Sequence, residues 1–389
     1  MIPEVIFWIC IFLVVHSYVL YPVILILFSR GRKGNQVVYD AEDKDLPFVS
    51  VIISAFNEES CIREKIESIN AGSYPPDKFE VLIGSDASSD RTVEIVRSSQ
   101  FAVRSSLRVF DFKERRGKQN VVNDLVRESK GEILVLTDAN VMFDTDTLYY
   151  MVRHFKNPEI GLVDTNMINR GMKESGISYQ EKAYISREVK IKDRESRIWG
   201  AMMGPFGGCY AIRKADYAMV PSNFLVDDFY INMKVFEKGK LAINDINSRV
   251  FEDLPEQLKV EFRRKVRIGT GDFQNLREFW RLIFKRPYGF AFLSHKVIRW
   301  FGPFFLITAL ILNIFLAFNN QYYLFIVLLA GQVSFYFVPF FDFLFKRAGV
   351  HLSLFRLITH FVAMNAALLI GFFRSLKAIR SGVWERTSR

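Results

Sequence analysis

Apolar residues are concentrated at the two ends of this 389-residue chain. Residues 3–28 carry a single charged side chain, and further apolar runs cover roughly 301–318, 322–345 and 355–373. A helix of about 20 mostly apolar residues spans a bilayer, so the pattern predicts a multi-pass membrane protein. The first run is too long for a secretory signal and lacks a small-residue cleavage site, which favours a retained anchor.

The middle of the chain instead alternates short β-rich runs with amphipathic stretches. This alternation predicts an α/β domain with a mostly parallel sheet. In such sheets ligands bind beyond the carboxyl ends of the strands, so polar residues at those ends are the first candidates for a site. The predicted strands cover 48–55, 79–85, 107–112 and 132–137, and the clearest helices cover 90–98 and 118–128.

These patterns divide the chain into six segments. Residues 276–300 contain aromatic residues interrupted by charges every few positions, which is typical of an interfacial amphipathic segment rather than a span. The expected segments are an N-terminal transmembrane helix at 1–30, a polar linker at 31–46, the α/β domain at 47–275, the interfacial segment at 276–300, C-terminal membrane helices at 301–378 and a basic tail at 379–389.

The formal net charge of +10 changes this picture little. Lys and Arg cluster beside the apolar runs, as expected at a bilayer surface, and no signature of nucleic-acid binding is present. The three isolated cysteines fit a reducing cytosol and provide neither a disulfide framework nor a metal cluster. We therefore expect the bilayer, and not nucleic acid, to be the partner of the basic residues.

The basic residues at 30–33 directly follow the first apolar run and place the α/β domain on the cytosolic side. Four crossings would then put the C-terminus outside, although five basic residues lie between 374 and 389. Either 355–373 does not fully cross or an earlier run is re-entrant. The charge favours a cytosolic tail.

Polar clusters follow the predicted strands in order. Asn57 and Glu58 follow the first strand, and Asp86 follows the second. Asp138-Ala139-Asn140 follows the fourth strand, and an acidic pair, Asp227-Asp228, comes after a later apolar stretch. Each cluster alone is compatible with a simple helix cap. Their order along one α/β sheet favours a shared site.

This ordered set resembles the GT-A glycosyltransferases of family 2, in the membrane-integrated branch that includes cellulose and hyaluronan synthases. The resemblance covers residues from about 48 to 275 and the flanking apolar runs. It implies a hexosyltransferase that inverts the anomeric carbon and moves a sugar from a nucleotide-diphosphate donor, expected to be a UDP-sugar. The implied acceptor is a carbohydrate or a lipid-linked glycan in cell-surface polysaccharide synthesis, at the inner membrane and with export proteins as partners.

The resemblance also implies the residues of a donor site. Asn57, Glu58 and Asp86 correspond to positions beside the nucleoside, and Lys118 begins the helix that meets the donor phosphates. Asp138 and Asn140 occupy the Asp-x-Asp positions that bind a divalent metal, where Asn140 replaces the usual second Asp. Oxygen ligands suit Mg²⁺ or Mn²⁺, which neutralises charge on the leaving diphosphate.

The acidic pair corresponds to the end of the family's Thr-Glu-Asp motif, here Val226-Asp227-Asp228. The resemblance makes Asp228 the catalytic base that deprotonates the acceptor hydroxyl. Asp227 then orients the acceptor or the loop. The alternative is a pair of acids that only caps a following helix.

Two further segments match the family pattern. Gly207, Gly208 and Cys209 belong to a glycine-bearing acceptor segment. Three basic residues fall where processive members carry Gln-x-x-Arg-Trp, and are expected to contact the pyrophosphate unless they only snorkel at the bilayer. Ile268 replaces the Trp of that motif, which favours single transfer over polymer synthesis. The three basic residues are Arg264, Lys265 and Arg267.

Two other functions stay open. One is a polyprenyl-phosphate sugar synthase, which generally lacks a half as long as residues 141–275. The other is a catalytically silent, nucleotide-binding partner of a polysaccharide secretion complex. The presence of Asp86, Asp138 and Asp228 favours an active enzyme over the silent partner.

Overall fold

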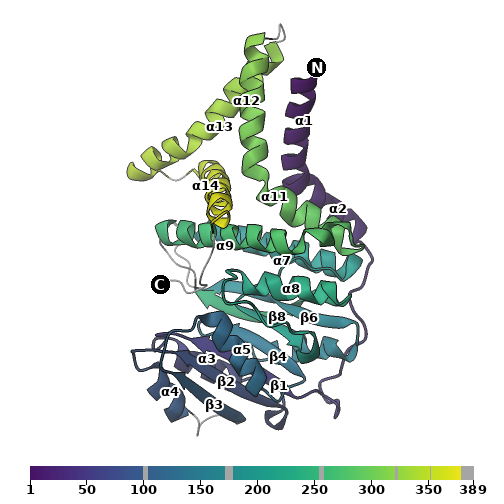
Figure 1. Ribbon diagram of the computed structural model, residues 1–389, viewed down its shortest axis with the longest axis vertical. Coiled ribbons are helices and arrows are strands. Elements are labelled where there is room, and N and C mark those ends of the chain that lie inside the picture. The colour runs from purple at the N-terminus through teal and green to yellow at the C-terminus, as the bar shows by residue number, and fades with distance from the viewer. Residues whose placement is uncertain (100–103, 171–177, 254–257, 320–322, 351, 378–389) are drawn as a thin grey trace.

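A computed structural model describes residues 1–99, 104–170, 178–253, 258–319, 323–350 and 352–377. The predicted basic tail at 379–389 lies outside the described residues. An α/β domain occupies one end of the molecule, and helices with exposed apolar side chains rise from it at the other end (Figure 1). The predicted division into an α/β domain and apolar helices is thus visible in the structure.

One eight-stranded sheet in the order β3-β2-β1-β4-β7-β6-β8-β5 forms the centre of the domain. The neighbours among β1 to β4 are parallel, β7 is antiparallel to β4 and β6, and β8 is parallel to β6. The predicted mostly parallel sheet is confirmed. The strands are β1 Val49–Ala55, β2 Phe79–Asp86, β3 Ser106–Phe112, β4 Ile133–Asp138, β5 Met142–Phe143, β6 Ile160–Arg170, β7 Cys209–Arg213 and β8 Leu241–Asp253.

The register brings the polar strand ends to one edge of the sheet. Ala55 of β1 pairs with Ser85 of β2, and Ser54 pairs with Asp138 of β4. The strands β1, β2 and β4 are buried almost throughout because helices cover both faces of the sheet. This burial fixes the alignment, since a slip by one residue would turn core side chains to the wrong face.

Two apolar layers enclose the sheet. One layer joins the sheet to α5 and α8, and the other joins it to α3, α4 and α6. Long helices α7 and α9 lie between the sheet and the apolar helices (Figure 1). The helices are α3 Ile62–Asn70, α4 Thr92–Ser99, α5 Lys118–Glu128, α6 Thr147–Val152, α7 Ser178–Trp199, α8 Asp227–Glu237 and α9 Leu258–Phe279.

Short helical turns connect these elements. Beyond α9 the chain turns back into the domain, and Tyr288, Phe292 and Trp300 join the apolar layer formed with α8. The segment predicted to be interfacial therefore also contributes to the core. The turns are η2 Pro76–Lys78, η3 Arg153–Lys156, η4 Lys214–Asp216, η5 Trp280–Phe284, α10 Tyr288–Ala291, η6 Phe292–Val297 and α11 Ile298–Trp300.

The described residues include four helical segments that are long and apolar enough to cross a membrane, in agreement with the sequence. The first, Ile2–Phe28, is continuous through α1 Ile2–Val15, η1 His16–Leu20 and α2 Tyr21–Phe28. It packs against α12, with Phe7 beside Ala309 and Leu316 in a shared cluster. The other three are α12 Gly302–Asn319, α13 Tyr323–Arg347 and α14 Ser353–Ser375.

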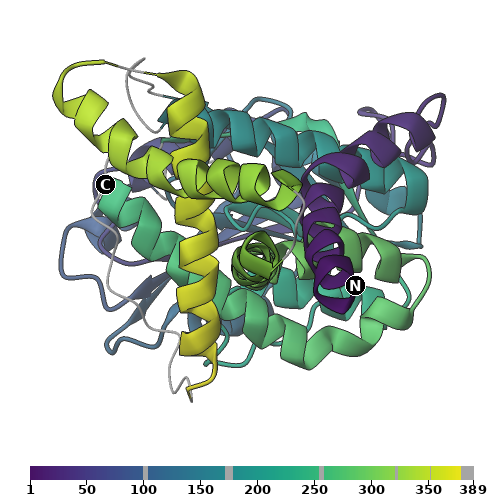
Figure 2. The same cartoon turned by 90° about the horizontal axis from the view of Figure 1, so that it is seen from above.

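The last of these helices differs from the others in direction. In Figure 1 α12 stands upright and α14 is seen nearly end-on, whereas in Figure 2 α12 is nearly end-on and α14 is seen along its length. α14 packs on α9, and a Cβ added at Gly371 would lie 2.7 Å from the Gly269 carbonyl carbon. The two backbones therefore touch, as small residues allow.

A buried polar cluster joins the first apolar segment to the α/β domain. The Tyr21 hydroxyl donates to Glu195 Oε1 of α7 at 2.6 Å, and His295 Nδ1 lies 2.8 Å from the same oxygen. His295 Nε2 lies 2.9 Å from Glu188 Oε2. Hydrogen bonds to buried carboxylates are among the stronger ones in proteins, so this cluster fixes the first apolar segment against the α/β domain.

Candidate functional site

The carboxyl edge of the sheet brings together residues from β4, β7 and α8. The Asp138 amide donates to the Gly208 carbonyl at 2.9 Å, so the end of β4 is held against the turn before β7. A Cβ added at Gly207 would lie 2.5 Å from Asp228 Oδ2. Only glycine at 207 allows this approach without a shift. The structure thus places Asp138, Gly207, Gly208 and Asp228 at one site.

Lys118 connects the two acidic parts of this site. It is the first residue of α5, as the sequence predicts, and its Nζ lies 2.7 Å from Asp138 Oδ1 and 3.9 Å from Asp227 Oδ2. Burial disfavours the ammonium, but the carboxylates of Asp138, Asp227 and Asp228 outweigh this and raise the pKa of Lys118. Lys118 is therefore a fixed positive charge between the end of β4 and the start of α8.

The acidic pair begins α8 directly, because Asp227 is its first residue and Val226 precedes it. Burial, followed by the negative charge of Asp227, raises the pKa of Asp228 to about 7. The Phe229 amide donates to Asp228 Oδ1 at 2.8 Å and acts in the opposite direction, as do Lys118 and Lys192. Asp228 can therefore take up or release a proton near neutral pH, which is the property required of a general base.

Asn140 contacts a strand that the sequence does not associate with the site. Its Nδ2 donates to Glu252 Oε1 of β8 at 2.9 Å. Pairing of Met142 in β5 with Phe251 in β8 fixes this arrangement. The sequence gives no signal for Glu252, since 112 residues separate it from Asn140.

Asp138 and Asn140 offer the oxygen atoms that a hard divalent cation prefers. Within the described residues no group of three or more His, Cys, Asp and Glu side chains is arranged to hold a metal. A cation here would therefore take its remaining ligands from water or from a bound diphosphate, as Mg²⁺ commonly does. The fit rests on this oxygen donor set, and because Lys118 Nζ already pairs with Asp138 Oδ1, the ion would bind through the other carboxylate oxygen or displace the ammonium.

The predicted nucleoside side of the site is built around Asp86. Its carboxylate is buried and accepts hydrogen bonds from the Arg116 amide at 2.6 Å, the Gly117 amide at 3.0 Å and Arg115 Nε at 3.2 Å. The Arg115 guanidinium in turn lies 3.4 Å from the centre of the Phe56 ring. Asp86 thus holds the loop that leads into α5 and Lys118.

Asn57 and Glu58 brace the neighbouring loops. Asn57 has a positive φ of 56°, and its Oδ1 accepts a hydrogen bond from the Ser89 amide at 2.8 Å. The Glu58 amide donates to Thr92 Oγ1 at 2.8 Å. These bonds tie the end of β1 to the loop after β2. The sequence does not single out Phe56 or the loop at 115–117. Arg115 of this loop nevertheless contacts both the Phe56 ring and the Asp86 carboxylate.

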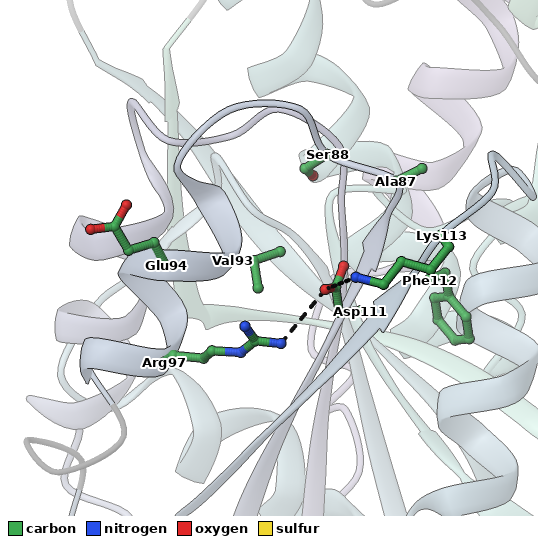
Figure 3. Close-up of a pocket in the computed structure, with 8 residues that line it drawn as sticks. All are labelled: Ala87, Ser88, Val93, Glu94, Arg97, Asp111, Phe112 and Lys113. Carbon is green, nitrogen blue, oxygen red and sulfur yellow. Dashed lines mark hydrogen bonds and ion pairs between the residues drawn. The ribbon is translucent and has the colours of Figure 1, made fainter.

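An open pocket of about 460 Å³ lies on the outer side of this region, between α4 and β3 (Figure 3). Asp111 Oδ2 lies 2.6 Å from Lys113 Nζ and 3.6 Å from Arg97 Nη2 across its floor. None of the predicted site residues lines this pocket. The pocket nevertheless adjoins the predicted nucleoside side, because its lining residue Ser88 accepts a hydrogen bond from the Asn57 amide at 3.1 Å.

Of the three predicted basic residues of α9, Arg267 is the one that interacts with the acidic site. Lys265 Nζ lies 3.3 Å from Glu261 Oε1, and Arg264 Nη1 lies 3.7 Å from Glu261 Oε2. Burial and then the neighbouring Arg264 lower the pKa of Arg267, and Asp227, Asp138 and Asp228 partly oppose this effect. Arg267 is therefore close enough to sense all three carboxylates.

Helix α9 also holds the loop that leads into the acidic pair. Gln274 Oε1 accepts the Leu225 amide at 3.2 Å, and Asn275 Nδ2 donates to the Val226 carbonyl at 3.2 Å. A Cβ added at Gly271 would lie 2.4 Å from Val226 Cγ2, so the loop rests directly on the helix. No motif in the sequence connects these α9 residues with Asp228.

Two buried side chains complete the support of the site. Lys65 Nζ donates to Thr137 Oγ1 at 2.8 Å and to the Val141 carbonyl, so it holds both sides of the 138–140 turn. Burial lowers the pKa of Lys65 to about 7. Burial likewise raises the pKa of the Cys209 thiol to about 12. Cys209 is therefore a packed thiol and not an exposed nucleophile.

Comparison with known proteins agrees with this geometry. Residues 50–218 match the family described as Glycosyl transferase family 2. Poly-beta-1,6-N-acetyl-D-glucosamine synthase of Staphylococcus epidermidis is 24% identical over 262 residues, which are 66% of this chain and 62% of that protein. The enzyme of that name from Staphylococcus aureus strain COL is 24% identical over 276 residues, 69% of this chain and 64% of the relative. The chain thus spans less than two thirds of these relatives.

Among solved structures, a similar one is the mannosyltransferase PcManGT from Pyrobaculum calidifontis in complex with GDP-Man and Mn²⁺. It is 22% identical, with a TM-score of 0.71 over 95% of this chain and 99% of that one. At this identity the likeness establishes the fold. The predicted GT-A domain is therefore confirmed.

Proposed function

We propose that this chain, a glycosyltransferase with a family 2 domain, moves a hexose from a nucleotide-diphosphate donor to a carbohydrate or lipid-linked acceptor with inversion. The observation that carries the proposal is the approach of Asp228 to Gly207 beside the Lys118–Asp138 ion pair. The candidate base Asp228 and the glycine at position 207 then lie at the same edge of the sheet as the ion pair between Lys118 and Asp138. Relatives named as polysaccharide synthases support a role in making a cell-surface polysaccharide.

The donor would bind along the edge from Asp86 to Asp138. Asp138 and Asn140 would hold Mg²⁺ or Mn²⁺, which, when bound, stabilises the charge of the departing diphosphate. Lys118 and Arg267 provide positive charge that is already in place, which needs no reorganisation as the bond to the sugar breaks. The neighbour that holds GDP-Man and Mn²⁺ supports a nucleotide sugar and a metal here. A UDP-sugar is our proposed donor.

The acceptor would enter beside Gly207 and Gly208. Asp228 would accept the proton of its attacking hydroxyl while the leaving diphosphate is held on the opposite side of the sugar. Its pKa of about 7 keeps a large fraction ionised at neutral pH and makes it a better base than an ordinary carboxylate. The negative charge of Asp227 raises the pKa of Asp228, and the Asp227 carboxylate also forms an ion pair with Lys118.

We also propose three membrane crossings, with the catalytic domain on the cytosolic side. The segment Ile2–Phe28 and the helices α12 and α13 would cross, whereas α14 would lie in the membrane surface. Its direction across α12 and its packing along α9 support this arrangement (Figures 1 and 2). Three crossings keep the five basic residues near the C-terminus in the cytosol, in agreement with the positive-inside rule.

The purified full-length chain in detergent, incubated with a panel of nucleotide sugars and Mg²⁺ or Mn²⁺, tests the proposal. The readout is acceptor-dependent release of nucleoside diphosphate, with Asp228→Asn as the matched inactive variant. Release with one donor by the wild type but not by the variant supports the proposal. Equal release by both proteins would refute the assignment of Asp228. Transfer only to polyprenyl phosphate would replace the proposed acceptor class.

A further inference from the structure

A cavity of about 750 Å³ lies outside the proposed catalytic site, where the end of α2 meets α7 and β6. Ile26 and Arg30 form the wall at the end of the first apolar segment. Asn169 of β6 and Arg194 of α7 line the opposite parts. The cavity therefore lies at the level where a crossing segment would leave the bilayer.

The lining of this cavity is positively charged. Arg30, Lys190, Arg194 and Arg197 line it together with a single acid, Asp193. Asp193 is already bound by Arg197, which donates to both of its carboxylate oxygens. Among the residues that the structure describes, the other three basic side chains form no ion pair. An anion in the cavity would thus meet an excess of unneutralised positive charge.

Asn169 adds a second and independent observation. Its side chain lines the cavity and is only 7% exposed. Neither its Oδ1 nor its Nδ2 has a hydrogen-bond partner within the described part of the chain. Buried amides normally satisfy both atoms. A ligand that pairs with it must both donate and accept, which a hydroxyl does and a phosphodiester anion does not.

The third feature is the apolar end of the cavity. Ile26 is 39% exposed and lies on the last turns of the first apolar segment. Val189 of α7 and Ile246 in β8 add apolar surface to the same lining. An occupant that matches the whole lining carries an acyl chain, an anionic phosphate and free hydroxyls.

We infer that this cavity binds the headgroup of an anionic phospholipid that bears hydroxyls, of which phosphatidylglycerol is the simplest. The phosphate lies among Arg30, Lys190 and Arg194, a hydroxyl pairs with the Asn169 amide, and the acyl chains follow Ile26 into the bilayer. The inference rests on the proposed crossing by the first segment. It does not depend on the sugar donor, so release of nucleoside diphosphate and lipid binding can fail separately.

Lipid binding to the full-length protein in detergent, measured by native mass spectrometry and by thermal unfolding during lipid titration, tests the inference. The probes are phosphatidylglycerol, phosphatidic acid, phosphatidylcholine and free glycerol 3-phosphate. We expect saturable binding of one phosphatidylglycerol, with the other three binding more weakly. Arg194→Gln should weaken phosphatidylglycerol binding about fivefold. Lys346→Gln, at the end of α13 and outside the cavity, is the matched control and should change it little.

Asn169→Leu should remove the preference for phosphatidylglycerol over phosphatidic acid, since the headgroup hydroxyls lose their partner. Arg194 lies partly exposed on α7, so Arg194→Gln provides a test even if Asn169→Leu unfolds. Equal weakening by the Arg194 and Lys346 variants would overturn the inference in favour of general surface charge. Equal binding of phosphatidylcholine would refute an anion site. Binding of glycerol 3-phosphate as tight as that of the lipid would refute a membrane source.

Discussion

Replacing Asn140 with Asp tests how this chain compensates for an incomplete Asp-x-Asp motif. The Asn140 amide nitrogen lies 2.9 Å from Glu252 Oε1, and Glu252 is only 8% exposed. In Asn140→Asp two carboxylate oxygens would meet at that distance. With an effective dielectric constant of about 20, the repulsion is about 6 kcal/mol. Keeping a proton on an ordinary carboxyl at pH 7 costs only about 4 kcal/mol.

In the Asn140→Asp variant, the carboxyl groups at positions 140 and 252 should therefore share one proton at pH 7, so that the substitution adds no charge to the metal site. Glu252→Gln removes one charge and should weaken metal binding. In the double variant the amide introduced at position 252 donates to a fully ionised carboxylate at position 140, which should strengthen binding by about tenfold, or about 1.4 kcal/mol. We expect the double variant to bind Mn²⁺ most tightly and Glu252→Gln to bind it most weakly. The wild type and Asn140→Asp should have similar, intermediate affinities.

Electron paramagnetic resonance of free Mn²⁺, with and without UDP, gives these affinities without any turnover. Thermal unfolding in EDTA shows whether each variant folds in the absence of metal. Tenfold tighter Mn²⁺ binding by Asn140→Asp alone would refute the reasoning, because it would mean that Glu252 does not control position 140. Equal affinities for all four proteins would place the metal elsewhere.

Four further predictions follow from the same contacts. Asp228→Asn should lower transfer about 10³-fold while UDP affinity changes little, and wild-type kcat/KM should fall below pH 7 because the base becomes protonated. Gly207→Ala should reduce transfer more than thermal stability, since its Cβ would meet Asp228 Oδ2 at 2.5 Å. The pKa of Lys65 is lowered to about 7 in the folded protein, so the unfolded chain binds this proton more tightly. The free energy of unfolding of the wild type, relative to that of Lys65→Met, should therefore rise between pH 7 and 10. Unfolding measured at a series of pH values tests this prediction. A cysteine at Lys377, in a cysteine-free background, should react with an impermeant label only after permeabilisation.

Each of these predictions has a distinct contrary result. Wild-type turnover by Asp228→Asn would remove its role as a base, and a flat pH profile would show that its ionisation is not limiting. Full activity of Gly207→Ala would mean that the close approach is not used in transfer. Identical pH slopes for wild type and Lys65→Met would indicate that this lysine stays charged, and labelling of intact cells at position 377 would require α14 to cross.

Much of the domain was predictable because its signals are local. The predicted helix at 118–128 coincides with α5, and the strand at 79–85 extends by one residue to Asp86. Strands buried on both faces require nearly continuous apolar residues, and the parallel arrangement then brings their carboxyl ends to one edge. The order of the motifs along the chain was therefore enough to expect Asp138 near Asp86 without knowledge of the fold.

Other parts of the site depend on residues that are distant in sequence. Lys65 holds the turn after Asp138, Glu252 contacts Asn140, and Asn275 supports Val226 from another helix. No local pattern marks such residues, because their significance comes from the packing of separate elements. Asp86 illustrates the same point: its strand-end position was predictable, but its three donors from the loop before α5 were not.

The sequence by itself therefore determined the α/β class, the apolar helices and the acidic residues of the site, since each follows from short-range patterns of burial and charge. Only the tertiary structure decided which partners those acids have and how α14 is directed. Hydropathy reports that a helix is long and apolar enough to cross a bilayer, but its direction is set by packing against neighbours. For α14 that neighbour is α9, met through Gly269 and Gly371.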